Sequence, residues 1–119
     1  MKNAFLISGL VEIVGAIVVY FNAEAIFPDS GYLLPKMYGI AAFVLGMISF
    51  LFWRKPDQDS ELYKQVFLCF MFFHAALAFT SYATPLEILP LKLGATLTHL
   101  FVFVVFFISY MNGLKPDQS

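Results

Sequence analysis

Three side chains of this sequence can carry chemistry, and all three lie inside apolar stretches. Glu12 lies in the first long apolar run, His74 in a run rich in Phe, and His99 in the last apolar stretch. A carboxylate and two imidazoles can share protons, bind a cationic or polar ligand, or hold a divalent metal. An ionisable group in the middle of a membrane costs about 2.5–3.5 kcal/mol, and such groups usually face the interior of a helix bundle. Glu12, His74 and His99 are therefore the candidate ligand- or proton-binding residues.

Each candidate also has a purely structural interpretation. A lone histidine inside a membrane helix is most often hydrogen-bonded to a neighbouring helix. Glu12 has the stronger claim to function, because burying a carboxylate costs more than burying a neutral imidazole. A metal would need Glu12, His74 and His99 to face one another with correct geometry, and axial haem ligation by the two histidines is a minor option. The identity of any cofactor or metal stays open.

The composition excludes a soluble globular protein. The 119 residues are 61% hydrophobic and 13% charged, whereas soluble domains are about 45–50% apolar and about 25% charged. A net charge of −1 gives no electrostatic basis for nucleic-acid binding. The length allows one domain, and the motifs of soluble enzymes, such as G-x-S-x-G and C-x-x-C, are absent. An enzymatic role is therefore not favoured, and no residue is predicted to be catalytic.

Four stretches are long enough to cross a bilayer, which takes about 20 mostly apolar residues. They cover about residues 4–21, 36–53, 62–82 and 91–111, and all six prolines fall in connections or at the ends of these stretches. The predicted fold is all-α: a polytopic four-transmembrane-helix bundle in which residues 1–119 form a single transmembrane domain.

The helices should bring the three candidate residues to a similar depth. With a rise of about 1.5 Å per residue, Glu12 lies about 12 Å into its span from the side of the termini. His74 and His99 each lie about 18 Å from that side. The depths predict a shared polar layer near the middle of the membrane.

The basic residues predict the orientation, since cytoplasmic loops carry an excess of Lys and Arg. Only Lys36 and Lys92 lie on the side opposite the termini; the others are Lys2, Arg54, Lys55, Lys64 and Lys115. Both termini are therefore expected in the cytoplasm. Aromatic rings expected at the membrane interfaces agree with these span ends; they are Tyr20, Trp53, Tyr63, Tyr82 and Tyr110.

Small residues on each span should let the helices approach closely. The predicted faces are Ala4, Ser8, Glu12, Gly15 and Ala16 on the first span; Gly39, Ala42, Gly46 and Ser49 on the second; His74, Ala75, Ala78 and Ser81 on the third; and Gly94, Ala95, Thr98 and His99 on the fourth. Most phenylalanines of the last two spans should face lipid or fill the core. Cys69 is expected to be a buried, inert thiol.

The connections differ in character. Residues 22–35 and 83–90 are rich in apolar side chains and are expected to lie on the membrane face or to cap the bundle, whereas 54–61 is polar and solvated. The tetrapeptide Lys-Pro-Asp-Gln follows both the second and the fourth span. It hints at a duplicated helical hairpin, although the spans do not align at the offset that these tetrapeptides set.

The segment Leu10-Val11-Glu12-Ile13-Val14-Gly15 resembles the first helix of the small multidrug resistance transporters. That family has four helices and one membrane-embedded glutamate that exchanges protons for cationic drugs. The resemblance implies that Glu12 is the coupling carboxylate of a dimeric, proton-coupled exporter. It covers about a dozen residues.

The layout of the whole chain resembles the DoxX-like group of small bacterial four-helix membrane proteins. The resemblance rests on Ser8-Gly9-Leu10 to Gly15, on Phe27-Pro28, and on Met37-Tyr38-Gly39-Ile40-Ala41-Ala42 to Gly46. It implies a bacterial inner (plasma) membrane and a binding or accessory role, because some members are subunits of membrane redox complexes. It supplies no catalytic residue.

Three functions therefore stay open. The first is a multi-pass membrane protein whose mid-membrane site binds a small ligand or carries protons. The second is a structural or accessory subunit of a larger membrane complex, and the third is the dimeric exporter. The expected partners are the lipid bilayer, a small ligand, and a second copy or a larger membrane complex.

Overall fold

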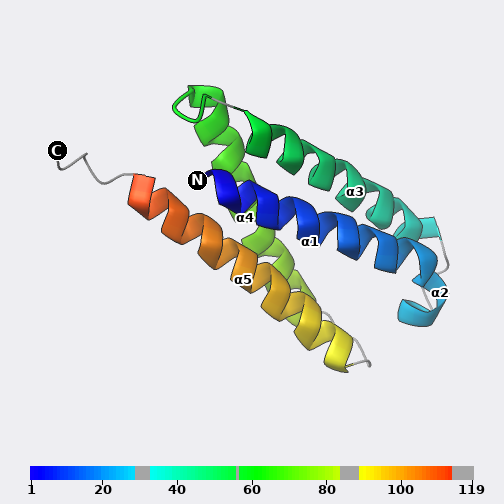
Figure 1. The fold of residues 1–119 in the computed structure, drawn as a ribbon. Helices are drawn as coiled ribbons and strands as arrows, with labels where there is room; N and C mark the ends of the chain where they lie inside the picture. The colour runs from blue at the N-terminus through cyan, green and yellow to red at the C-terminus, as the bar shows by residue number, and fades with distance from the viewer. Residues whose placement is uncertain (29–32, 56, 84–88, 114–119) are drawn as a thin grey trace. The chain divides into compact units, whose positions relative to one another are not determined.

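The computed structural model describes residues 1–28, 33–55, 57–83 and 89–113. Every regular element within these ranges is an α-helix (Figure 1). The elements are α1 (Lys2–Phe21), α2 (Ala23–Ile26), α3 (Leu33–Arg54), α4 (Glu61–Ala83) and α5 (Leu89–Gly113). All except α2 are long and apolar enough to cross a membrane. The prediction of an all-helical chain with four long apolar helices is confirmed.

The long helices extend slightly beyond the predicted spans. Helix α3 begins at Leu33 and α5 at Leu89, so Pro35 and Pro90 lie in the first turns of these helices. Proline is tolerated there because the first N–H groups of a helix have no partner within it. The sequence prediction began each span after its proline and therefore missed this first turn.

The predicted polar connection between α3 and α4 contains the N-terminal cap of α4. The Ser60 hydroxyl accepts a hydrogen bond from the Tyr63 N–H at 3.3 Å, and the Asp57 carboxylate accepts one from the Ser60 N–H at 3.1 Å. Such caps satisfy N–H groups that the first turn of a helix leaves unpaired. Glu61 adds a favourable negative charge in the first turn.

The chain divides into two compact units. One comprises Phe5–Arg54, and the other comprises Met1–Ala4 with the described residues from Lys55 onward. We call them the α1–α3 hairpin and the α4–α5 hairpin. The assignment of residues 1–119 to a single domain stays a prediction.

Helices α1 and α3 run side by side in opposite directions (Figure 1) and pack through glycine. A Cβ added to Gly46 would lie 2.6 Å from Ile13 Cγ1 and 3.2 Å from the Gly9 carbonyl oxygen. A Cβ on Gly39 would lie 3.1 Å from the Ala16 carbonyl oxygen. Between the helices the buried hydroxyls of Ser8 and Ser49 share a hydrogen bond of 3.2 Å. Small residues thus allow the close backbone approach that the sequence predicted.

Two of the glycines on the predicted faces do not lie at a helix contact. Gly15 and Gly94 are exposed, and a Cβ on either would meet nothing within 4 Å. In α1 the close contact is made by Gly9 instead. The prediction erred because Gly15 is next to Ala16 in sequence, and a helix turns about 100° between neighbours, so only one of the two faces α3.

The α4–α5 hairpin packs through aromatic rings. The Phe67 and Phe106 rings lie 4.7 Å apart between centroids, and the Phe70 ring is stacked with that of Phe106 at 6.4 Å. Other rings face outward, among them Phe72, Phe79, Phe101 and Phe107. The prediction that Cys69 is buried is wrong: this thiol is exposed on the outer face of α4.

Each hairpin has a lysine above a tyrosine ring at the end where its chain turns. Lys36 Nζ lies 5.5 Å from the centre of the Tyr20 ring, and Lys92 Nζ lies 5.6 Å from the centre of the Tyr82 ring. A cation above an aromatic face is electrostatically attracted to it. Tyr63, another aromatic residue expected near a span end, lies in the first turn of α4 and is fully buried.

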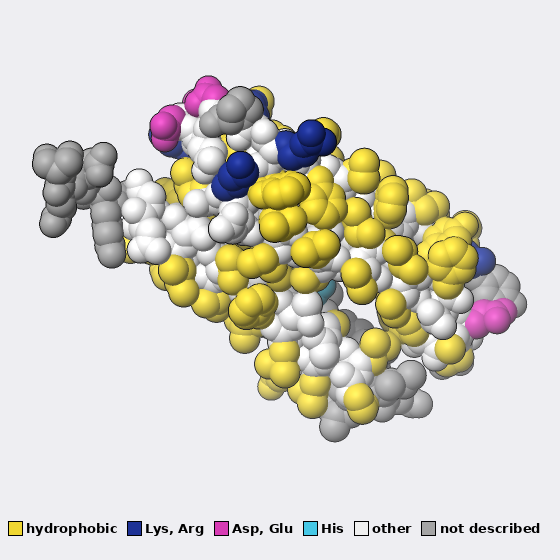
Figure 2. Space-filling view, viewed as in Figure 1, with side chains coloured by type: hydrophobic (Ala, Val, Ile, Leu, Met, Phe, Trp, Pro, Cys, Tyr) yellow, Lys and Arg dark blue, Asp and Glu magenta, His cyan; other side chains and the backbone are white. Residues whose placement is uncertain are grey.

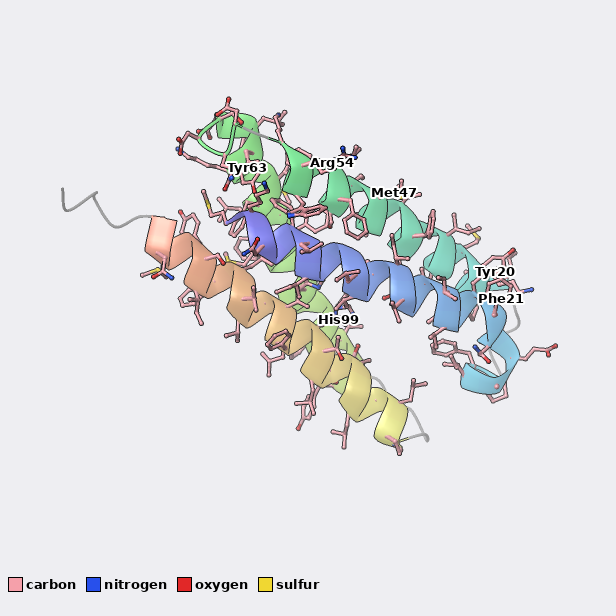
Figure 3. The ribbon with its side chains drawn as sticks, viewed as in Figure 1. Tyr20, Phe21, Met47, Arg54, Tyr63 and His99 are labelled. Carbon is pink, nitrogen blue, oxygen red and sulfur yellow. The ribbon has the colours of Figure 1, made fainter. Side chains whose placement is uncertain are left out.

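Exposed apolar side chains lie along both long helices of the α1–α3 hairpin. Tyr20 and Phe21 lie at the end of this hairpin opposite Arg54, and Met47 points outward between them (Figure 3). Figure 2 shows hydrophobic side chains along the sides of the helices and Lys, Arg, Asp and Glu side chains near their ends.

The apolar connection at residues 22–35 is partly helical. The single turn α2 buries Ala23 and Ile26, whereas Leu33 and Leu34 at the start of α3 are exposed. Most of the other apolar connection, at 83–90, lies outside the described residues, as does the second Lys-Pro-Asp-Gln segment.

Candidate functional site

The structure brings two of the three candidate residues together. His74 in α4 and His99 in α5 face each other with their Nδ1 atoms 3.1 Å apart. Their rings are stacked, with centroids 5.3 Å apart and planes inclined by 27°. His99 lies about midway along α5 (Figure 3). The sequence predicted a common depth for these histidines, and their contact within one hairpin agrees with it.

Apolar rings surround the histidine pair. His74 is fully buried and His99 partly buried. The Phe73 ring meets the His74 ring edge to face at 5.2 Å, and the Phe106 ring is tilted against it at 5.8 Å. In such apolar surroundings, the hydrogen bond between the two imidazoles is electrostatically stronger than it would be in water.

The contact between two Nδ1 atoms fixes the tautomers of the rings. An imidazole Nδ1 either carries a hydrogen and donates or is bare and accepts. One ring must therefore hold its proton on Nδ1 while the other holds its proton on Nε2. The neutral pair then presents one accepting Nε2, on the donor ring, and one donating Nε2–H, on the acceptor ring.

The hydrogen-bonded histidine pair can bind one further proton. When the bare Nε2 gains a proton, the donor ring becomes imidazolium and still donates its Nδ1–H to the other ring. A second added proton would place two N–H groups opposite each other and remove the hydrogen bond. The shared proton can also cross from one Nδ1 to the other, and the acceptor ring then releases the proton on its Nε2. The pair can thus take up one proton at one ring and release one at the other.

The same distance fits two ligands of one metal ion. Tetrahedral coordination with Zn–N bonds of about 2.0–2.1 Å places two nitrogen ligands roughly 3.3 Å apart, close to the observed 3.1 Å. A stable metal site needs further ligands, which were predicted to include Glu12.

Glu12 belongs to the α1–α3 hairpin. It is buried, as are Ser8 and Ala16, which lie one turn before and one turn after it on α1. Its meeting with His74 and His99 stays a prediction.

Helices α1 and α4 can be aligned so that Glu12 corresponds to His74. When Tyr20 is aligned with Tyr82, identical residues coincide at Lys2 and Lys64, Phe5 and Phe67, Leu6 and Leu68, and Ala16 and Ala78. The buried positions also coincide: Phe5, Ser8, Glu12 and Ala16 in α1 match Phe67, Phe70, His74 and Ala78 in α4. This alignment was missed from the sequence because the tetrapeptides after α3 and α5 set a different offset.

Thr96 is a polar residue near the histidine pair that the sequence analysis missed. Its hydroxyl is buried and has no hydrogen-bond partner among the described residues. It lies one turn before His99 on α5. The sequence prediction chose Thr98 for the inner face, but Thr98 is exposed. The heptad spacing of Lys92, Thr96 and His99 on one face of α5 was the available signal.

Comparisons of this chain with family models, with curated proteins and with solved structures found no match.

Proposed function

We propose that this chain is a multi-pass membrane protein whose site at Glu12, His74 and His99 carries protons, either alone or coupled to a small ligand. The observation that supports this function best is the hydrogen bond between His74 and His99. Imidazole is the side chain that gains and loses protons most readily near neutral pH. A pair that keeps its hydrogen bond with or without one added proton is suited to transfer.

The proposal includes Glu12 as the group that exchanges protons with the histidine pair. The correspondence of Glu12 with His74 in the repeated helices supports this role, since equivalent helices of a repeat present equivalent positions to their surroundings. A carboxylate is also the natural acceptor for an imidazolium N–H, because charge-assisted hydrogen bonds are the stronger kind.

We place the four long helices across a bacterial inner membrane as a four-helix bundle with cytoplasmic termini. Their length and composition support the placement. The contacts of Lys36 with Tyr20 and of Lys92 with Tyr82 fit one interface, where long basic side chains reach the headgroups beside aromatic rings. The resemblance to DoxX-like proteins remains part of this proposal.

Labelling of single cysteines tests the orientation. In a Cys69→Ser background, Asn3→Cys and Gln118→Cys should resist a membrane-impermeant thiol reagent in intact cells and react after the cells are opened. The five basic residues on the side of the termini are the physical reason. Labelling of either cysteine in intact cells would reverse the orientation.

Proton flux into liposomes tests the function. With the purified protein reconstituted and a potential imposed by potassium and valinomycin, an internal pH dye should report faster acidification than in empty liposomes. Glu12→Gln and His99→Gln should each lower the protein-dependent rate at least about tenfold, because a glutamine amide does not transfer protons at neutral pH.

Glu24→Gln is the matched control for Glu12→Gln. Glu24 is exposed in α2, and the same change of charge there should leave the flux unaltered. A wild-type rate equal to that of empty liposomes would refute proton transfer by the protein alone. Tight Zn²⁺ binding by the wild-type that His99→Gln abolishes would favour a metal site instead.

A further inference from the structure

The inner face of α5 changes character at His99. Towards the end where the α4–α5 hairpin turns, this face carries Thr96 and then Lys92, one and two turns from the histidine. Towards the other end it carries Val102 and Phe106, which are both fully buried.

The face of α4 that packs against α5 also changes at His74, from small residues on the turn side to aromatic residues on the other side. On the turn side of His74 it carries the small residues Ala78 and Ser81, and on the other side it carries Phe70 and Phe67. The Phe67 ring packs against that of Phe106 at 4.7 Å. Stacked rings at these separations leave no space for water between α4 and α5.

On the turn side, one polar group lacks a partner. The Thr96 hydroxyl is buried without a hydrogen bond to any described residue. Buried hydroxyls in proteins are nearly always satisfied, and ordered water is the usual partner where the protein supplies none. Because His74 contacts His99 and Tyr82 contacts Lys92, the small residue Ala78, which lies between His74 and Tyr82 on α4, is near the level of Thr96 on α5.

We propose that water enters the α4–α5 hairpin from its turn end, binds the Thr96 hydroxyl and reaches the histidine pair from that side only. Lys92 and Tyr82 then stand at the entrance, and the rings of Phe67, Phe70 and Phe106 close the opposite side. The last step rests on the proposed function. A proton that the histidine pair exchanges with bulk water through this hairpin enters and leaves at the end where the hairpin turns.

Two cysteines placed symmetrically about His99 test the access route. Thr96→Cys and Val102→Cys lie one turn to either side of the histidine on the same face of α5, and both changes alter the volume little. In a Cys69→Ser background, a small water-soluble thiosulfonate should modify residue 96 at least about tenfold faster than residue 102. Equal rates, or faster modification at 102, would overturn one-sided access. The labelling rates do not depend on whether the protein carries protons, so they stand apart from the flux test.

Thermal unfolding tests the bound water. Thr96→Val removes the hydroxyl and keeps the shape, so loss of a water-mediated hydrogen bond should lower the melting temperature, whereas Thr96→Ser should preserve it. Thr98→Val makes the same change at an exposed site on the same helix and should leave the temperature unchanged. If the Thr96 hydroxyl were dry, its removal would relieve an unsatisfied polar group, and a melting temperature of Thr96→Val at or above the wild-type value contradicts the proposal.

Discussion

The variant His99→Leu is expected to unfold more easily than the wild-type, by about 1–3 kcal/mol. The change removes the imidazole whose Nδ1 lies 3.1 Å from that of the buried His74, and with it the hydrogen bond between the two rings. Removing a hydrogen-bond partner of a buried polar group costs about 1–3 kcal/mol. Unfolding in a graded series of denaturing detergent, followed by circular dichroism, measures the effect.

The double variant His74→Leu/His99→Leu is the critical comparison. Because it removes both polar groups together, no imidazole is left unsatisfied, and the loss of stability should be smaller than the sum of the two single losses. The expected coupling is about 0.5–3 kcal/mol, which is the range for residues in direct contact. Strict additivity of the two changes would mean that the two rings do not share a hydrogen bond.

Alanine at position 46 should separate α1 from α3. Its Cβ would lie 2.6 Å from Ile13 Cγ1 and 3.2 Å from the Gly9 carbonyl oxygen. Overpacking of this kind costs about 1–3 kcal/mol, and Gly46→Ala should lower stability by that amount in the same detergent titration.

Gly15→Ala is the matched control, because a Cβ at position 15 meets nothing within 4 Å; it should not lower stability and should raise it by up to about 1 kcal/mol through helix propensity. Adding Ile13→Ala to Gly46→Ala removes the closest clashing atom and should recover part of the lost stability. Equal effects of alanine at positions 15 and 46 would show that these helices do not meet through Gly46.

Hydropathy and proline placement were enough to predict four long helices, because an apolar stretch of this length must satisfy its backbone hydrogen bonds internally. Ser8, Gly46 and Ser49 were correctly placed on inner faces, since the helical period assigns residues to faces. It was harder to predict which of two nearby residues faces a neighbouring helix. Gly15 was chosen beside Ala16, and Thr98 was chosen two residues from Thr96, because a small rotation of a helix decides which neighbour faces inward.

The histidine pair could be predicted only in part. The number of residues from each span end predicted that His74 and His99 lie at one depth, because apolar stretches and prolines mark those ends in the sequence. Their direct contact depends on the rotation of α4 against α5, which the packing of Phe67, Phe70 and Phe106 determines. Cys69 illustrates the same limit: its apolar neighbours suggested burial, but a helix in lipid is apolar on its outer face as well.

The correspondence between α1 and α4 has a consequence for symmetry. Two separate copies of one hairpin would form a symmetric pair, in which every position offers two identical side chains. A chain that joins two copies of a hairpin is free of this constraint, and each copy can diverge on its own. At the aligned positions of α1 and α4, Glu12 is an acid and His74 is a base. A symmetric pair could offer only two carboxylates or two imidazoles there, whereas the joined chain has one group of each kind.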